Sequence, residues 1–153
     1  MSVSKPPATP RVHVREASWQ TDRPALERIR EAVFIREQGV PTALEWDSAD
    51  ATCLHALAET VNRDPVGTGR LEADGKIGRI AILRQHRNAG IGAAVLQHLI
   101  REAQRRGMKQ VYLFAQVSAL AFYQRHGFVP EGNVFMEAGI PHRRMQLRFE
   151  DRP

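Results

Sequence analysis

Residues 77–115 read IGRIAILRQHRNAGIGAAVLQHLIREAQRRGMKQVYLFA, and this stretch decides the fold. Its apolar beginning, 77–83, predicts a strand, and the polar residues 84–89 predict a loop. Apolar residues then recur at the spacing of one helix face: Ile91, Val95, Leu99 and Ala103. Gly107 is suited to cap this helix, and residues 110–115 predict a second strand. Because a helix separates the two strands, we expect them to be parallel.

The chain before this unit predicts a strand, a helix and a hairpin. Alternating apolar residues favour a half-buried strand at 11–16. Thr21 and Asp22 are candidate N-caps for a helix that ends near Gln38 and Gly39, before a proline. Residues 54–61 and 66–73 predict two antiparallel strands, because the turn-forming sequence Asn62-Arg63-Asp64-Pro65 joins them.

The chain after the unit predicts one short helix and one strand. Ser118 is a candidate cap for a helix that carries Phe122 and Tyr123, and Gly127 ends it. Residues 142–149 predict a terminal strand.

Length and composition indicate one domain. A chain of 153 residues with 42% hydrophobic content can form one sizeable core, which we place at 11–149. Residues 1–10 contain three prolines and predict a flexible tail. No apolar run approaches the ~20 residues of a membrane span, and the beginning of the chain lacks the apolar core of a secretory signal. With one cysteine, Cys53, the sequence is compatible with a reducing compartment, and we expect a cytoplasmic protein.

The net charge of +5 raises the question of nucleic-acid binding. The basic residues are spread along the chain among 17 acidic residues, and no basic run exceeds two residues. Only 7% of the residues are aromatic, and they lie in scattered positions, so the sequence offers no stacking platform for RNA. We therefore expect neither a nucleic-acid nor a membrane partner.

The loop from Arg87 to Gly92 has the form of an anion site. The first amides of a helix lack internal partners, and glycines at 90 and 92 let a pyrophosphate approach the backbone. Arg87 can add a charge-assisted contact. The loop completes neither a Walker sequence nor a dinucleotide fingerprint, and by itself a plain helix start is an alternative reading.

The second helix supplies the missing support. Ala121-Phe122-Tyr123 followed by His126-Gly127-Phe128 lies one helix and one strand after the Arg87–Gly92 loop. With these two motifs the chain resembles the GNAT superfamily of N-acetyltransferases, over roughly residues 11–149. A narrower resemblance, to its ElaA-like bacterial branch, rests on residues 33–41, 45–47 and 135–142, together with Asp50, His55 and Met145.

The resemblance implies an α/β (α+β) fold: a central mixed, mostly antiparallel sheet with two splayed parallel strands, flanked by helices on both faces. It implies acetyl-CoA as cofactor, with the pantetheine arm between strands 77–83 and 111–115, where a bulge would expose free amides. The expected cofactor-binding residues are Ile80, Ala81, Ile82, Leu83, Arg87, Asn88, Ala89, Gly90, Ile91, Gly92, Ala93, Gln116, Ala119, Phe122 and Tyr123.

The resemblance also assigns the catalytic roles. Tyr123 would protonate the leaving thiolate. The candidates for the base that deprotonates the amine lie in segments that flank the acceptor side in the family's architecture, and we favour Glu137 or His142 among them: Glu45, Asp47, Asp50, His55, Glu137 and His142. The expected acceptor-binding residues are Glu45, Trp46, Asp47 and His55, with Asp50 a further candidate on the acceptor side. No metal is expected.

The function implied is N-acetylation of a primary amine of a small molecule, for example an amino sugar or a polyamine, by direct attack in a ternary complex. A protein or peptide N-acetyltransferase is an alternative. Another is a non-catalytic acyl-CoA sensor, which retention of Tyr123 disfavours. Pairing through terminal strands, common in the superfamily, suggests a homodimer.

Overall fold

The computed structural model describes residues 11–39 and 48–150. The strands are β1 (Val12–Ala17), β2 (Leu54–Thr60), β3 (Pro65–Leu71), β4 (Ile77–Ile82), β5 (Gln110–Gln116), β6 (Val129–Glu137) and β7 (Ile140–Arg148). The helices are α1 (Arg23–Arg30), α3 (Ile91–Arg105) and α4 (Leu120–Arg125), with the π-helix η1 (Glu31–Glu37) and the 3₁₀ turns η2 (Ser48–Ala51), η3 (Arg84–His86) and η4 (Val117–Ala119). Within the described ranges, no helix has the length and apolar content that a membrane crossing requires. The tail predicted at 1–10 lies outside these ranges.

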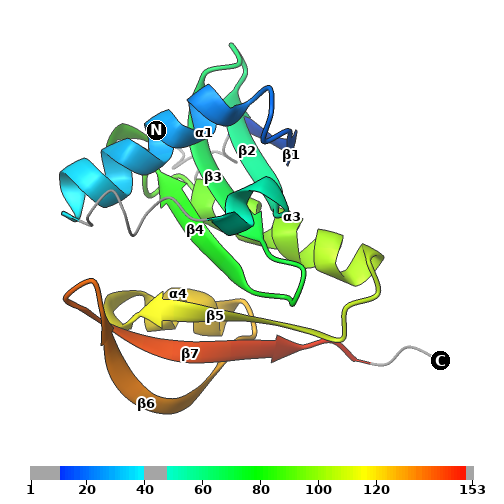
Figure 1. Ribbon diagram of the computed structural model, residues 1–153, viewed down its shortest axis with the longest axis vertical. Coiled ribbons are helices and arrows are strands. Elements are labelled where there is room, and N and C mark those ends of the chain that lie inside the picture. The colour runs from blue at the N-terminus through cyan, green and yellow to red at the C-terminus, as the bar shows by residue number, and fades with distance from the viewer. Residues whose placement is uncertain (1–10, 40–47, 151–153) are drawn as a thin grey trace, which may run out of the picture.

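The strands form two antiparallel sheets that meet at one point (Figure 1). The first has the order β1-β2-β3-β4 and the second the order β5-β7-β6. They are joined by a single parallel bridge between Lys76 and Tyr112, where the amide of Tyr112 donates to the carbonyl of Gly75 at 3.1 Å. After this bridge β4 and β5 diverge, which confirms the expected fold class with its two splayed parallel strands.

Helices cover both faces of the first sheet (Figure 1). On one face, Leu26 and Ile29 of α1 pack with Leu57 of β2 and Ala81 of β4. On the other face, α3 packs its buried residues against the core formed by β2, β3 and β5. These are Ile91, Val95, Leu96, Leu99, Ile100 and Ala103. All four positions predicted for this helix face are buried, so the 3.6-residue period identified it correctly.

The predicted N-terminal helix is present, but its hydrogen-bonding pattern changes from that of an α-helix to that of a π-helix. After Arg30 the chain widens into η1, in which the amide of Gln38 donates to the carbonyl of Val33, five residues earlier, at 3.1 Å. Gly39 follows in the left-handed region at φ +73°, as expected for a helix end. The N-cap prediction needs correction: Asp22 occupies the cap position without capping, because its carboxylate binds Arg15 at 2.9 and 3.0 Å and the amide of Ser18 at 2.8 Å.

Two expectations for the C-terminal part are also corrected. Ser118 lies inside η4 and makes no capping bond to α4. The sequence reading missed β6, because Pro130, Gly132 and Asn133 look like turn residues. β6 is an edge strand whose pairing with β7 is interrupted between Glu131 and Phe135, and an edge strand tolerates such residues.

Gly69 of β3 lets α3 lie close to the first sheet. A Cβ there would lie 2.9 Å from Val95 Cγ1 and 3.0 Å from Leu99 Cδ1. We expect Gly69→Ala to lower the free energy of unfolding by about 1–3 kcal/mol in urea denaturation, because the core must shift. Gly78→Ala is the matched control, since nothing lies within 4 Å of its Cβ. Equal stability of the two variants would show that this contact does not limit the packing.

Candidate active site

A cavity of about 350 Å³ lies where β4 and β5 diverge. Its walls come from both sheets, from η1 and from the second cofactor motif. The lining residues are Phe34, Gln38, Lys76, Ile77, Gly78, Arg79, Ile80, Leu113, Phe114, Gln116, Ala119, Tyr123, Glu137, Ala138, Ile140 and His142. Segments more than 100 residues apart in the sequence therefore share one cavity.

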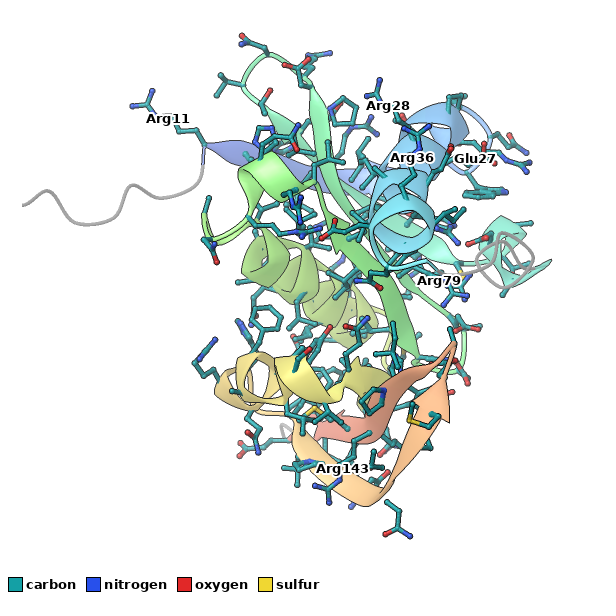
Figure 2. The ribbon with its side chains drawn as sticks, turned by 90° about the vertical axis from the view of Figure 1, so that its left-hand side faces the viewer. Arg11, Glu27, Arg28, Arg36, Arg79 and Arg143 are labelled. Carbon is teal, nitrogen blue, oxygen red and sulfur yellow. The ribbon has the colours of Figure 1, made fainter. Side chains whose placement is uncertain are left out.

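A bulge in β4 forms part of this cavity. The pairing register between β3 and β4 shifts between Thr68 and Arg70, so that Arg79 and Ile80 both lie opposite Gly69. Arg79 takes a positive φ of 52°, which is unusual for a residue with a side chain. In Figure 2, Arg79 lies on the side of the first sheet that carries α1, next to the second sheet. The bulge expected in this strand is therefore present.

The loop between η3 and α3 exposes a row of backbone amides. Asn88 and Gly90 take positive φ angles of 62° and 80°, and residues 88–90 are exposed. Among the residues that the structure describes, no hydrogen-bond acceptor is found for the amides of residues 88–93. These amides begin the 15-residue helix α3, where the helix dipole adds partial positive charge. The arrangement suits an anion.

Arg87 is held by a residue that the sequence reading did not single out. Its guanidinium donates to both carboxylate oxygens of Glu37 in η1, at 2.5 and 2.7 Å, and its Nε donates to the carbonyl of Ile82 at 3.0 Å. This pairing lowers the pKa of Glu37 and raises that of Arg87. No sequence motif links residues 37 and 87, so only the fold could reveal the pair. Gln38, the residue after Glu37, accepts a hydrogen bond from Gln116 at 3.1 Å, so the end of η1 is linked both to Arg87 and to the end of β5.

Tyr123 lines the cavity from α4. Its ring lies edge-on to Phe122 and Phe128, with centroids 5.0 and 5.9 Å apart. Burial raises the pKa of the phenol to about 12. Tyr123 therefore keeps its proton throughout the neutral range, as a proton donor must.

His142 and Glu137 line the same cavity from the β6–β7 hairpin. His142 Nδ1 lies 2.7 Å from the carbonyl of Ile140, and a carbonyl can only accept, so Nδ1 carries the proton of the neutral ring. Nε2 then has a free lone pair and lies 3.7 Å from Glu137 Oε2. The pair is arranged to take up a proton, with the carboxylate beside the resulting imidazolium.

His55 and Asp50 lie outside the cavity, in a buried network that connects β2, β3, the end of α1 and η2. His55 is 1% exposed, stacks on Trp19 at 4.8 Å, and its Nε2 lies 2.8 Å from the carbonyl of Asp50. The Asp50 carboxylate binds Arg30 and Arg70, each at 2.8 Å. Neither His55 nor Asp50 lines the cavity, and their contacts fix the segment on which η2 lies.

The other predicted site residues divide into three groups. Ile80, Gln116 and Ala119 line the cavity. Ala81 is buried against α1, and the amide of Leu83 is bonded to the carbonyl of Val66 at 2.9 Å. Glu45, Trp46 and Asp47 lie outside the described residues. In residues 11–39 and 48–150, no cluster of three His, Cys, Asp or Glu side chains could hold a metal ion.

Several lining residues were missed. The alternation along β5 could have identified Phe114, because it lies on the same face as the predicted Gln116. Lys76 carried no motif, and Phe34 and Gln38 were interpreted as parts of a helix.

Comparison with known proteins decides the family. A family model described as an acetyltransferase (GNAT) domain matches residues 22–149. The chain therefore belongs to the GNAT acetyltransferase family. This GNAT N-acetyltransferase is 37% identical over 121 residues to the uncharacterized N-acetyltransferase YjcF of Bacillus subtilis. The match covers 76% of this chain and 86% of YjcF.

Two solved structures resemble this transferase closely. The acyl-CoA N-acyltransferase from Pseudomonas aeruginosa is 28% identical with a TM-score of 0.79, covering 89% of this chain and 99% of that one. Escherichia coli ElaA is 27% identical with a TM-score of 0.79, covering 90% and 99%. The resemblance to the ElaA-like branch is thereby confirmed.

We expect Asp50→Asn to destabilise the transferase by about 3–5 kcal/mol at neutral pH, because it removes the charge on which two buried guanidiniums converge. Burial alone would raise the pKa of Asp50, but Arg30 and Arg70 outweigh it and lower the pKa below 3.8. This stabilisation is therefore present above about pH 3.9, the unfolded value, and is lost as the pH falls through the lower folded pKa.

Urea denaturation at several pH values measures this effect, with the exposed Asp64→Asn as control. A variant as stable as the wild type would contradict the role of Asp50.

Proposed function

We propose that the protein transfers an acetyl group from acetyl-CoA to a primary amine of a small molecule, by direct attack in a ternary complex, in the cytoplasm. The observation that carries this proposal is that Tyr123 and the His142–Glu137 pair line one cavity. A candidate proton donor and a candidate proton acceptor thus share one cavity, in which we propose that the thiolate leaves and the amine attacks.

The amides of residues 88–93 fit the diphosphate of coenzyme A. Their N–H groups have no acceptor among the described residues, and they lie at the N-terminus of a helix. Gly92 lies beside Phe122, since a Cβ at Gly92 would be 3.8 Å from that ring. We assign cofactor binding to this loop, to β4 from Ile80 to Ile82, and to Gln116, Ala119, Phe122 and Tyr123. Acetyl-CoA supplies the thioester carbonyl and the thiol leaving group when it is bound.

His142 is the preferred base. Its Nε2 takes a proton from the incoming ammonium, and Glu137 stabilises the imidazolium that results. The reference pKa of a lysine-like ammonium is about 10.4, so this proton must be removed before attack.

Tyr123 completes the proton balance. Its hydroxyl donates a proton to the thiolate as the carbon–sulfur bond breaks, and the tyrosinate then takes up the second proton of the attacking nitrogen, which the new amide must lose, while His142 releases its proton to solvent. The reference pKa of a thiol, about 8.5, is well below the value of about 12 for the phenol, so the donation alone is uphill and is completed when Tyr123 regains a proton from that nitrogen. We assign polarisation of the carbonyl to a backbone amide at the Arg79–Ile80 bulge, where pairing with β3 is interrupted.

The size of the cavity favours a small acceptor. A volume of about 350 Å³ lies at the lower end of the range for small-molecule sites, and an extended peptide would need a longer groove. We retain Glu45, Trp46 and Asp47 as candidate contacts for the acceptor. Protein acetylation is less compatible with this cavity.

The edge of the second sheet supports a homodimer. Among the described strands, none pairs with the outer side of β6, which exposes large apolar side chains: Val129, Val134 and Met136 are 60%, 56% and 64% exposed. Such an edge pairs readily with another strand, and we propose a second copy of this chain.

The test is a panel of primary amines assayed for thiol release from acetyl-CoA. We expect turnover with at least one small amine, and Tyr123→Phe to lower kcat about 100-fold while the Kd for coenzyme A stays nearly constant. Tyr112→Phe is the matched control, because Tyr112 bonds to Asp74 and does not line the cavity. Unchanged kcat for Tyr123→Phe would remove the acid assignment. Binding of coenzyme A without any turnover would favour a sensor.

A further inference from the structure

Resting on the proposed function, we propose that Lys76 forms a subsite for an acidic group, a carboxylate or a phosphate, carried by the acceptor amine. The proposed acceptor therefore has its amine at one end and its acid at the other. The cavity places a cation, an aromatic surface and a base in that order.

Lys76 lines the cavity and also forms the bridge to Tyr112 that joins the two sheets. Its ammonium is 4.3 Å from the centroid of the Phe114 ring. Its backbone amide donates to Asp74 Oδ1 at 3.1 Å, while the other oxygen of Asp74 accepts the hydroxyl of Tyr112. The backbone at Lys76 is thereby fixed, and the ammonium extends over an aromatic face.

No carboxylate oxygen among the described residues lies within 4.0 Å of the Lys76 ammonium, and the carboxylate of Asp74, whose pKa the charge of Lys76 helps to lower, acts on it from a greater distance. An ammonium has three donors, and the face of Phe114 satisfies none of them as a full hydrogen bond. An anionic group entering the cavity would find these donors in a partly desolvated site, where a charge-assisted contact is strong.

The base lies across an aromatic surface from Lys76. Phe114 meets Phe135 edge-on with centroids 5.3 Å apart, and Phe135 stacks on His142 at 6.0 Å. Of these two rings only Phe114 lines the cavity, so an acceptor that reaches from the ammonium of Lys76 to the imidazole of His142 passes one aromatic face. The matching acceptor has a short apolar spacer between its amine and its acidic group.

The charges around the cavity favour such an acceptor over a simple amine. The described lining contains two cations, Lys76 and Arg79, and one carboxylate, Glu137. Arg79 has interactions of its own, so a molecule with only an ammonium would gain the attraction of Glu137 and meet chiefly the like charge of Lys76. A molecule that also carries an acid would place its negative group on the cationic side.

The experiment compares amines that have one chain length and different ends: 5-aminopentanoate, its terminal phosphonate analogue and 5-aminopentanamide. Turnover is measured as thiol release, and binding of each amine is measured by calorimetry. We expect the wild type to prefer an acidic end over the amide by about 10-fold or more in kcat/KM and in Kd. Comparison of the carboxylate with the phosphonate identifies the preferred acid.

Lys76→Met keeps the aliphatic stem over Phe114 and removes the charge. We expect it to abolish the preference for the acidic end over the amide, measured as the ratio of the two kcat/KM values and of the two Kd values, whereas Lys76→Arg retains the preference. Lys109→Met is the control, because Lys109 is exposed and does not line the cavity.

Two outcomes overturn the inference: a wild type that treats acidic and amide ends alike, or a Lys76→Met variant that keeps the preference. If no amine is acetylated, the proposed function fails. Calorimetry with the same amines still decides the role of Lys76, because it requires no turnover.

Discussion

The structure depends on one parallel contact, the bridge between Lys76 and Tyr112, and on the divergence of β4 and β5 beyond it. Two antiparallel sheets that met along their whole length would leave no cavity. The Arg79–Ile80 bulge interrupts the regular pairing of β4 with β3 at the level of the cavity. α3 connects the two sheets through the chain and buries one face along its whole length, so the divergence is fixed by packing on both sides.

A second constraint links the cofactor loop to the end of β5. Glu37 and Gln38 are neighbours at the end of η1, yet one binds Arg87 beside the loop and the other binds Gln116 at the end of β5. A diphosphate placed on the loop amides would lie near a guanidinium that already has a carboxylate partner. The amides, rather than Arg87 alone, must then provide most of the grip. π-Helical turns such as η1 occur often at functional sites, because they bring side chains out of the regular helical spacing.

The sequence predicted the parts of this account that depend on local patterns. The period of α3, the hairpin of β2 and β3, and the motifs at Gly90, Gly92 and Tyr123 follow from spacing and from a family resemblance. The Glu37–Arg87 pair and the cation at Lys76 could not be predicted, because each depends on segments brought together only by the fold. β6 was missed because an edge strand accepts proline and glycine. His55 was expected at the acceptor side, and the structure places it beside Trp19 in the core, where burial lowers the pKa of its ring.

The central claim is that the amides at the start of α3 hold the diphosphate of coenzyme A and thereby direct its sulfur towards Tyr123. Calorimetric titration of coenzyme A into Gly92→Asp and Gly92→Asn tests it most directly, because the two side chains have nearly the same shape and differ in charge. The nearest atoms to a Cβ at Gly92 are 3.8 Å away, so the Cβ of either variant makes only ordinary contacts. The account predicts that the aspartate weakens binding about 10-fold or more relative to the asparagine. Equal affinities for the two variants would contradict it.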